Sequence, residues 1–154
     1  MQLNEQIQQD ISAYYIREAD AIKKIKMKEL TLYFDGLCPL CSKEMAHLAK
    51  HDVNSLLELV DVHTERFSEQ TLVTKDKAMD LLHAVDAEGN MYVGLDAAYQ
   101  AWRLVGKGWL YRPLRSPLIK PIADRAYYWF VRNRYSISAK LLGTSACKDG
   151  QCKR

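Results

Sequence analysis

The 154-residue chain is predicted to fold as one α/β domain, in which helices pack on a small central sheet. Its length suits a single domain, because domains most often run to about 100–150 residues. Its composition, 48% hydrophobic and 27% charged, excludes a collagen, a coiled-coil rod and a wholly disordered chain. Segments typical of strands and helices follow in the order β-α-β, then a β-hairpin, then α, which favours such a sandwich.

The first half of the chain supplies the β-α-β part. Apolar residues recur at spacings of three and four over residues 3–28, so residues 1–28 are predicted to be an N-terminal helical extension. Strands are predicted over residues 29–34 and 56–62 from their aliphatic, aromatic and β-branched side chains. The helix between them is expected to run from about Pro39 to about Lys50, with its inner face formed by Met45 and Leu48.

The hairpin and a further helix follow. Residues 79–85 are predicted to form a third strand and residues 91–93 a short fourth one, joined by the turn Asp86-Ala-Glu-Gly-Asn90. Asp96 is expected to cap a helix over residues 97–105, because a carboxylate can accept the unpaired N–H groups of a first helical turn.

The last part of the domain contains a broken segment and a final helix. Residues 106–117 contain Gly, Pro and Arg and are expected to form a loop or a broken helix, and Pro121 then opens the last helix. One face of that helix is expected to pack inward, with Arg125, Arg132 and Arg134 off it; the face consists of Ile122, Ala126, Trp129 and Phe130. The predicted domain thus covers residues 29–142, and residues 143–154 are expected to form a flexible tail that contains cysteines.

Charge is divided unevenly along the chain. Residues 1–102 carry 10 basic and 17 acidic side chains, whereas residues 103–154 carry 12 and 2. Such asymmetry is typical of a surface that binds nucleic acid or anionic lipid, or of a basic face that is simply solvated. We favour the solvated face. Aromatic residues interleave with arginines over residues 109–135, which leaves peripheral membrane contact open, but no nucleic-acid signature accompanies them.

The start of the chain is polar and acidic, and no apolar run approaches the roughly 20 residues of a membrane helix. The chain is therefore expected in the cytoplasm, where thiols are kept reduced and a close cysteine pair indicates catalysis or metal binding rather than a structural disulfide.

Cys38 and Cys41 lie where the first predicted strand passes into the first domain helix. The opening turn of a helix has unpaired N–H groups and the positive end of the dipole, so a Cys38 thiolate is favoured and its pKa lowered. The i, i+3 spacing puts Cys41 on the same face, so the two sulfurs can exchange with a partner's disulfide. We expect Cys38, at the exposed helix start, to attack and Cys41 to resolve the mixed disulfide. The alternative is two small apolar side chains in a core helix.

The stretch Tyr33-Phe-Asp-Gly-Leu-Cys-Pro-Leu-Cys41 resembles the signature of the DCC family, thiol–disulfide oxidoreductases of thioredoxin-like fold. Residues 86–97 and 126–135 are also similar to the family pattern, so the resemblance covers about residues 29–142. It implies a thioredoxin-like sandwich, catalytic Cys38, Cys41 and Asp35, and an active-site loop that includes Gly36, Pro39 and Leu40. It also implies a thiol or disulfide substrate, on a protein or a small molecule.

No organic cofactor is expected, because the disulfide itself carries the electrons. One departure concerns the cis-proline that better-known thioredoxin relatives place before the facing strand. Here no proline lies between Pro39 and Pro113, so general reduction of protein disulfides is not implied.

Asp35 has two interpretations. Its carboxylate could accept or relay the proton of the resolving Cys41. Alternatively, Asp before Gly36 forms the turn and caps the helix. The two roles are compatible, and the residue pattern alone favours the structural one.

The C-terminal cysteines and the four histidines are the remaining candidate site residues. For Cys147 and Cys152, we favour incidental thiols first, a disulfide relay to Cys38 and Cys41 second, and a zinc site formed by all four cysteines third. The zinc site ranks last because 105 residues separate Cys41 from Cys147. The rival function is a non-enzymatic binding module, either stabilised by zinc on the four cysteines or docking a membrane or protein partner through the basic aromatic C-terminal helix. His47 and His51 are expected to be surface or partly packed side chains, and His63 and His83 lie on or near strands with nothing that marks them as catalytic.

Overall fold

A computed structural model describes residues 28–69 and 72–143 and contains a four-stranded sheet in the order β2-β1-β3-β4. The strands are β1 (Leu30–Phe34), β2 (Leu57–Asp61), β3 (His83–Asp86) and β4 (Met91–Val93). Strand β1 runs parallel to β2 and antiparallel to β3, and β3 and β4 form the predicted hairpin. This order of elements confirms the predicted α/β, thioredoxin-like architecture.

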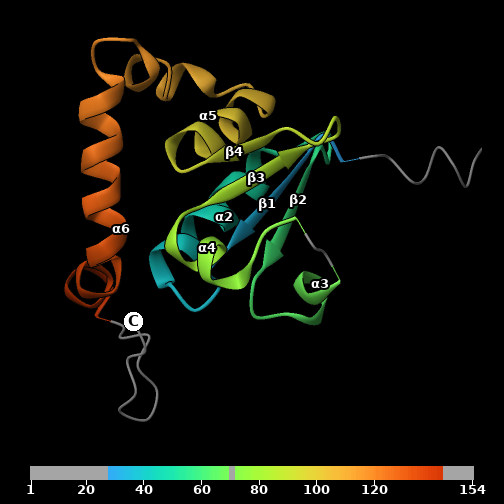
Figure 1. The fold of residues 1–154 in the computed structure, drawn as a ribbon, viewed down its shortest axis with the longest axis horizontal. Helices are drawn as coiled ribbons and strands as arrows, with labels where there is room; N and C mark the ends of the chain where they lie inside the picture. Colours follow the sequence, from blue (N-terminus) through green and yellow to red (C-terminus); the bar gives the residue numbers. More distant parts are fainter. Residues whose placement is uncertain (1–27, 70–71, 144–154) are drawn as a thin grey trace, which may run out of the picture.

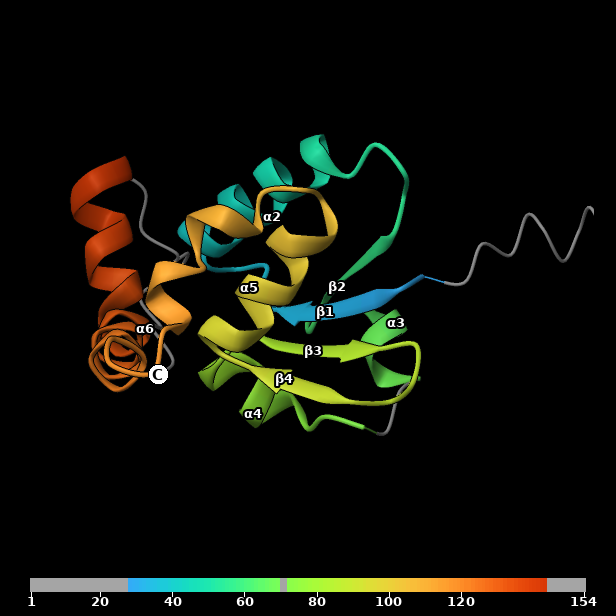
Figure 2. The ribbon, with the colours of Figure 1, turned by 90° about the horizontal axis from the view of Figure 1, so that it is seen from above.

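Helices cover both faces of the sheet (Figure 2). On one side lie α2 (Pro39–His51) and α5 (Leu95–Leu104), and on the other lie α3 (Glu65–Ser68) and α4 (Lys75–Asp80). Two buried clusters fill the two layers. One joins β1 to α2 and α5 and includes Leu32, Leu48 and Trp102; the other lies beneath α3 and α4 and includes Tyr33 and Phe67.

Helix α2 is fixed at both ends by side-chain hydrogen bonds. Cys38 is its N-cap and Pro39 its first residue, where the missing N–H leaves no bond unmade. After its last residue, the carboxylate of Asp52 accepts the backbone N–H groups of Leu56 and Leu57 and so connects the helix to β2. Met45 and Leu48 form the predicted inner face, with 5% and 0% of their surface exposed.

The start of the predicted third strand is wrong. Residues 75–80 form helix α4, and β3 begins only at His83. The apolar run Met79–Val85 is compatible with either conformation, since periodicity does not separate a short buried strand from a buried helical turn. Ala78 is buried against the second cluster and Met79 packs against it, so the helix has its own packing partner.

The predicted cap of α5 is also wrong. Its N-cap is Gly94, whose φ of +62° lies in the left-handed region that glycine adopts without strain. Asp96 lies inside the first turn and instead accepts hydrogen bonds from Arg115 (2.9 Å) and Lys120 (2.6 Å). Its carboxylate therefore connects α5 to the start of the last helix. The expected broken segment contains two single-turn helices, η1 (Gly108–Leu110) and η2 (Pro113–Arg115).

The last helix, α6 (Lys120–Leu142), stands at one end of the sandwich in both ribbon views (Figures 1 and 2). Its inner face differs from the prediction. Ile122 and Trp129 are 70% and 63% exposed, and the buried residues are Ala123, Val131, Arg134 and Ser138. A buried arginine carries no apolar signal, so periodicity alone assigned the face to the wrong side of the helix.

The predicted helical extension and the cysteine-containing tail lie outside the described residues, apart from Lys28 and Gly143. Within residues 28–69 and 72–143, no helix combines the length and the apolar character that crossing a membrane requires.

Candidate active site

The cysteine pair follows a tight turn between β1 and α2. The N–H of Leu37 donates to the side chain of Asp35 at 3.1 Å, and the N–H of Cys38 donates to the backbone carbonyl of Asp35 at 3.2 Å. The Ser42 hydroxyl donates to the Gly36 carbonyl at 2.8 Å. The predicted turn-forming role of Asp35 is therefore observed, whereas the N-cap of the helix is Cys38 itself.

Position 36 requires glycine because the Asp61 carboxylate lies very close to it. Its N–H donates to Asp61 Oδ1 at 3.0 Å, and a Cβ atom at this position would lie 1.9 Å from the Asp61 carboxylate. The same carboxylate oxygen accepts the N–H of His63 at 3.0 Å. Asp61 thus fastens the turn after β1 to the loop after β2.

The Cys38 sulfur occupies the thiolate position that the sequence predicts. Sγ accepts the backbone N–H of Cys41 at 3.3 Å. The Cys41 thiol also donates to it, and this lowers the pKa of Cys38 to about 7, with help from the backbone N–H and the charge of Arg134. Burial and the Asp35 carboxylate act in the opposite direction.

The two cysteines have unequal surroundings. The Cys38 side chain has no exposed surface, so the expected exposed helix start is wrong, and Cys41 is the partly exposed member of the pair. The pKa of Cys41 is raised far above its ordinary value, first because its proton is engaged by Cys38 and then by burial. The pair is therefore set up as one acidic thiol and one that holds its proton.

Asp35 is the centre of a buried polar cluster below the pair. Its side chain is 1% exposed and accepts from His63 Nε2 at 2.9 Å, from Arg134 Nη2 at 2.9 Å and from the Tyr135 hydroxyl. Burial alone would raise the pKa of this carboxyl, but the hydrogen bonds from Tyr135 and His63 and the charge of Arg134 hold it below its usual value. Asp35 is therefore an anion at neutral pH.

Arg134 carries the matching charge. It comes from α6, 99 positions after Asp35, and its Nη2 also donates to the backbone carbonyl of Met79. Burial opposes its charged form, but its partners outweigh burial and the pKa of Arg134 is raised, so it remains a cation. Its Nε is buried and has no hydrogen-bond partner among the described residues.

His63 is the residue that the sequence interpretation missed. A carboxylate only accepts hydrogen bonds, so Nε2 of His63 donates to Asp35. A topological signal could have found it. Strands β1 and β2 are parallel and pair Phe34 with Asp61, so residues that follow the two strands meet at the same edge of the sheet.

The other histidines have structural surroundings. His47 and His51 share one face of α2 and lie against Trp102, with ring centroids 5.7 Å from it in each case. His83 is buried and donates from Nδ1 to the Leu81 carbonyl. His47 and His51 are thus surface or partly packed groups, as predicted.

The remaining predicted site residues divide into two sets. Pro39 and Leu40 lie in the first turn of α2 and are half-buried. Cys147 and Cys152 lie outside the described residues, so the relay, disulfide and zinc interpretations that involve them stay predictions. Within the described part of the chain, no group of three or more His, Cys, Asp or Glu side chains could hold a metal ion.

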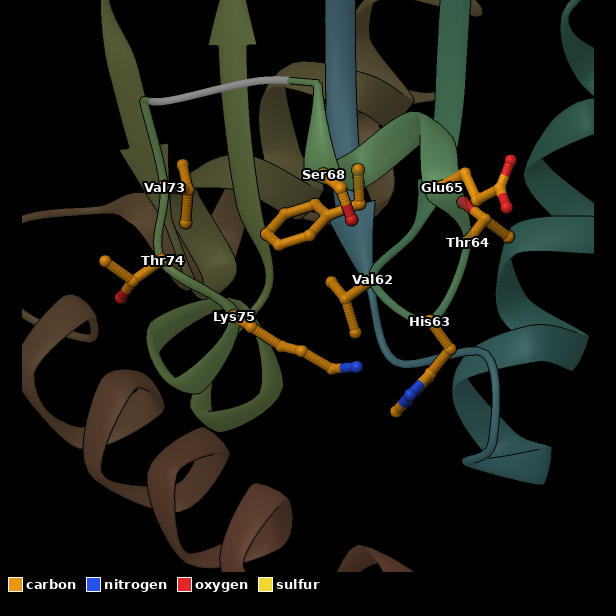
Figure 3. A pocket seen from close by; sticks show the side chains of 9 residues that line it. Val62, His63, Thr64, Glu65, Ser68, Val73, Thr74 and Lys75 are labelled. Carbon is orange, nitrogen blue, oxygen red and sulfur yellow. The ribbon is translucent and has the colours of Figure 1, made fainter.

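A pocket of about 570 Å³ adjoins this cluster through His63. It lies between the loop after β2 and the start of α4, and its apolar lining includes Val62, Phe67 and Val73. The side chains of His63 and Lys75 extend toward one another across it (Figure 3). The pocket thus has apolar walls and is bordered by His63, Lys75 and Glu65, next to the cluster that supports the cysteines.

The comparisons with known proteins agree with this geometry. A family model described as DCC1-like thiol-disulfide oxidoreductase matches residues 32–140. The Arabidopsis thaliana protein At5g50100, named as chloroplastic, is 25% identical over 115 residues, which is 73% of this chain and 54% of the relative. The chain thus spans about half the length of that relative. YuxK of Bacillus subtilis (strain 168) is 28% identical over 109 residues, covering 68% of this chain and 77% of the relative. No solved structure matches the chain at a significant level.

Proposed function

The chain belongs to the DCC1-like thiol-disulfide oxidoreductase family, and on this basis we propose that Cys38 and Cys41 are the redox pair with which it exchanges thiols and disulfides. The observation that carries the proposal is the hydrogen bonding of Cys38 Sγ at the start of α2. The thiolate is the nucleophile in such chemistry, and a pKa of about 7 makes a large fraction of Cys38 thiolate at neutral pH.

The proposed reaction proceeds through a mixed disulfide. The Cys38 thiolate attacks one sulfur of the substrate disulfide, whose S–S bond breaks, and the other substrate sulfur leaves as a thiolate that takes up a proton. Cys41 then loses its proton and attacks Cys38 Sγ, which releases the second substrate thiol. The protein dithiol is oxidised to the Cys38–Cys41 disulfide, and the substrate disulfide is reduced to two thiols by the same two electrons.

No organic cofactor takes part in this proposal, because the disulfide carries the electrons. Substrate access follows from the unequal exposure of the pair. Cys41 has accessible surface and Cys38 has none, so a substrate sulfur reaches Cys38 past the exposed Leu37 or past Cys41. We therefore expect small disulfides to react faster than folded protein disulfides.

Asp35 acts as a positioning residue in this proposal. The hydrogen bonds that it accepts hold its pKa below the usual value, which makes it a weak base for the Cys41 proton. Its negative charge also raises the pKa of Cys38 rather than lowering it. What Asp35 contributes is the placement of Arg134, whose positive charge favours the thiolate.

Trapping the mixed disulfide tests the assignment of the two cysteines. The full chain carrying Cys147→Ser and Cys152→Ser serves as the background, so that only the pair can react. With Cys41→Ser added, glutathione disulfide at pH 7 should convert Cys38 to a stable mixed disulfide, detected by intact-protein mass. With Cys38→Ser added instead, the reaction should be at least about tenfold slower, because the pKa of Cys41 is raised.

The pH dependence of alkylation provides a second readout. In the Cys41→Ser background the serine hydroxyl replaces the Cys41 thiol as the side-chain donor to Cys38, so the native pair has to be measured as well. In the reduced native protein, iodoacetamide should label Cys38 with a midpoint near pH 7. Equal rates for the two single-cysteine variants, together with a midpoint at the ordinary value of a free thiol, would refute the assignment.

The compartment remains a prediction. The cytoplasm expected from the sequence supplies the reducing conditions that keep both thiols free. The name of the Arabidopsis relative places that protein in the chloroplast, so we propose a reducing compartment for this chain, of which the cytoplasm is one.

A further inference from the structure

Helix α6 carries a stripe of exposed side chains, which we call the basic aromatic face. It consists of Leu118, just before the helix, and of Ile122, Arg125, Trp129 and Arg132 within it. The spacings of three and four place these residues on one side of the helix. Leu118, Ile122 and Trp129 are 87%, 70% and 63% exposed, although each is a large apolar residue.

The basic aromatic face points away from the sandwich. The opposite side of α6 is buried and includes Ala123, Val131 and Arg134, and α6 stands at the end of the molecule (Figure 1). The packing of the domain therefore uses one side of the helix and leaves the other without a partner among the described residues. Isolated exposed apolar residues are normal on a protein surface, but a stripe of this kind marks an interaction site.

The charges on and around this face are mainly positive. The only acidic residue from 103 to 143 is Asp124, and its carboxylate is occupied by Arg115 at 2.6 Å and Lys120 at 3.5 Å. Arg132 lies over the ring of Tyr128, 5.3 Å from its centroid, and within the described residues no carboxylate pairs with Arg125 or Arg132. The face therefore presents unneutralised guanidinium groups beside apolar side chains.

An anionic lipid surface fits this combination. Its phosphate groups pair with guanidinium ions, and the boundary between headgroups and acyl chains accepts Trp, Ile and Leu. Residues 1–27 of this chain fit less well, since they carry four acidic and four basic side chains and offer no net negative charge. The described chain also begins at the end of the molecule opposite α6 (Figures 1 and 2).

We propose that the basic aromatic face of α6 binds the surface of anionic membranes, with the helix lying along the headgroups. The 23 residues of α6 give it a length of about 35 Å, so both arginines and Trp129 can reach one flat surface. The helix does not span the bilayer. Binding of this kind goes beyond the redox reaction and would hold the cysteine pair near the membrane.

Vesicle binding by the full chain tests the proposal. The probes are vesicles of phosphatidylcholine alone and of phosphatidylcholine with about 30% phosphatidylserine. Sedimentation should recover the chain with the anionic vesicles, and added salt should weaken this binding because charge attraction contributes to it. Trp emission should shift to shorter wavelength on binding, and Trp129→Phe should remove most of that shift.

Two sets of variants and a control distinguish binding through the basic aromatic face from a general effect of the net charge of the protein. Arg125→Glu with Arg132→Glu should lower partitioning onto anionic vesicles about tenfold or more, since both cations would face the lipid. Ile122→Ser with Trp129→Ser should also lower it about tenfold, through lost apolar burial. The matched control is Lys43→Glu with Lys50→Glu on α2, which makes the same change in net charge at exposed positions and should lower partitioning only about twofold or less.

All variants replace exposed side chains, so their urea midpoints should stay close to that of the native chain. Absence of binding to anionic vesicles, equal binding to neutral ones, or an equal loss in the α2 control would each overturn the proposal. In that case the face would serve a protein partner or none. The redox proposal would stand, because its cysteine readouts do not depend on lipid.

Discussion

Replacing Arg134 by Met is the sharpest perturbation of the buried cluster. Arg134 Nη2 lies 2.9 Å from Asp35 Oδ2, and the two side chains are 8% and 1% exposed. Removing one partner of a buried ion pair leaves an uncompensated charge and costs about 3–5 kcal/mol. Tyr135, His63 and the Leu37 N–H still donate to Asp35, so we expect a loss of unfolding free energy near the lower end, about 3 kcal/mol.

The same substitution should change the acidity of Cys38. The charge of Arg134 lowers the pKa of Cys38, while that of Asp35 raises it. With the arginine removed and the carboxylate retained, the pKa of Cys38 rises above about 7 and its alkylation at pH 7 slows several-fold. Urea unfolding measures the first effect, and iodoacetamide labelling of folded protein across pH 6–9 measures the second.

Arg134→Lys is the matched control, since it keeps the charge but loses the two-pronged guanidinium. It should lose stability and keep the alkylation midpoint near that of the native chain. If Arg134→Met and Arg134→Lys shift the midpoint equally, the effect comes from disturbed packing rather than charge, and the electrostatic reasoning is wrong.

Three further substitutions test the surroundings of the pair. Gly36→Ala forces a Cβ against the Asp61 carboxylate, so it should lower the unfolding free energy by about 1–3 kcal/mol in urea unfolding. Leu48→Ala, at a fully buried position, should cost about 2–5 kcal/mol, whereas Leu141→Ala, at a 71% exposed one, should stay within about 0.5 kcal/mol. Asp35→Asn should have a much lower unfolding free energy than the native chain at pH 7 in urea unfolding, and the difference between the two should narrow as pH falls below about 4. The lowered pKa of Asp35 means that its contribution is complete above the ordinary carboxyl value and is lost on protonation; a gap independent of pH would contradict this.

Local chemistry made the first half of the site predictable. Strand β1, the turn at Asp35-Gly36 and the proline at the start of α2 follow one another in the sequence. Their local signals therefore combine to predict a strand, a turn and a helix start. Cys38 as a thiolate follows from that placement alone. Its complete burial does not, because the side chains that cover it come from elements distant in the sequence.

The second half of the site depends on contacts across the chain. Arg134 is buried because Asp35 accepts its hydrogen bond. The two residues are 99 positions apart, so the sequence near Arg134 does not show that carboxylate. A rule that places apolar residues inward therefore assigns the buried face of α6 to Ile122 and Trp129. His63 was missed for a related reason, since its partner follows a neighbouring strand. Sheet topology, once known, supplies that contact.

A ribosome makes Cys38 and Cys41 well before it makes Arg134, because the ion pair beneath them joins residues 99 positions apart. A nascent chain that has completed its sheet but not α6 carries both thiols without the guanidinium and without the Tyr135 hydroxyl. Its Asp35 then lacks two of the donors that keep the carboxyl ionised. The share of the Cys38 acidity that comes from the charge of Arg134 is thus present only in the finished polypeptide, whereas the hydrogen bonds from Cys41 act within the first turn of α2 as soon as that turn has formed.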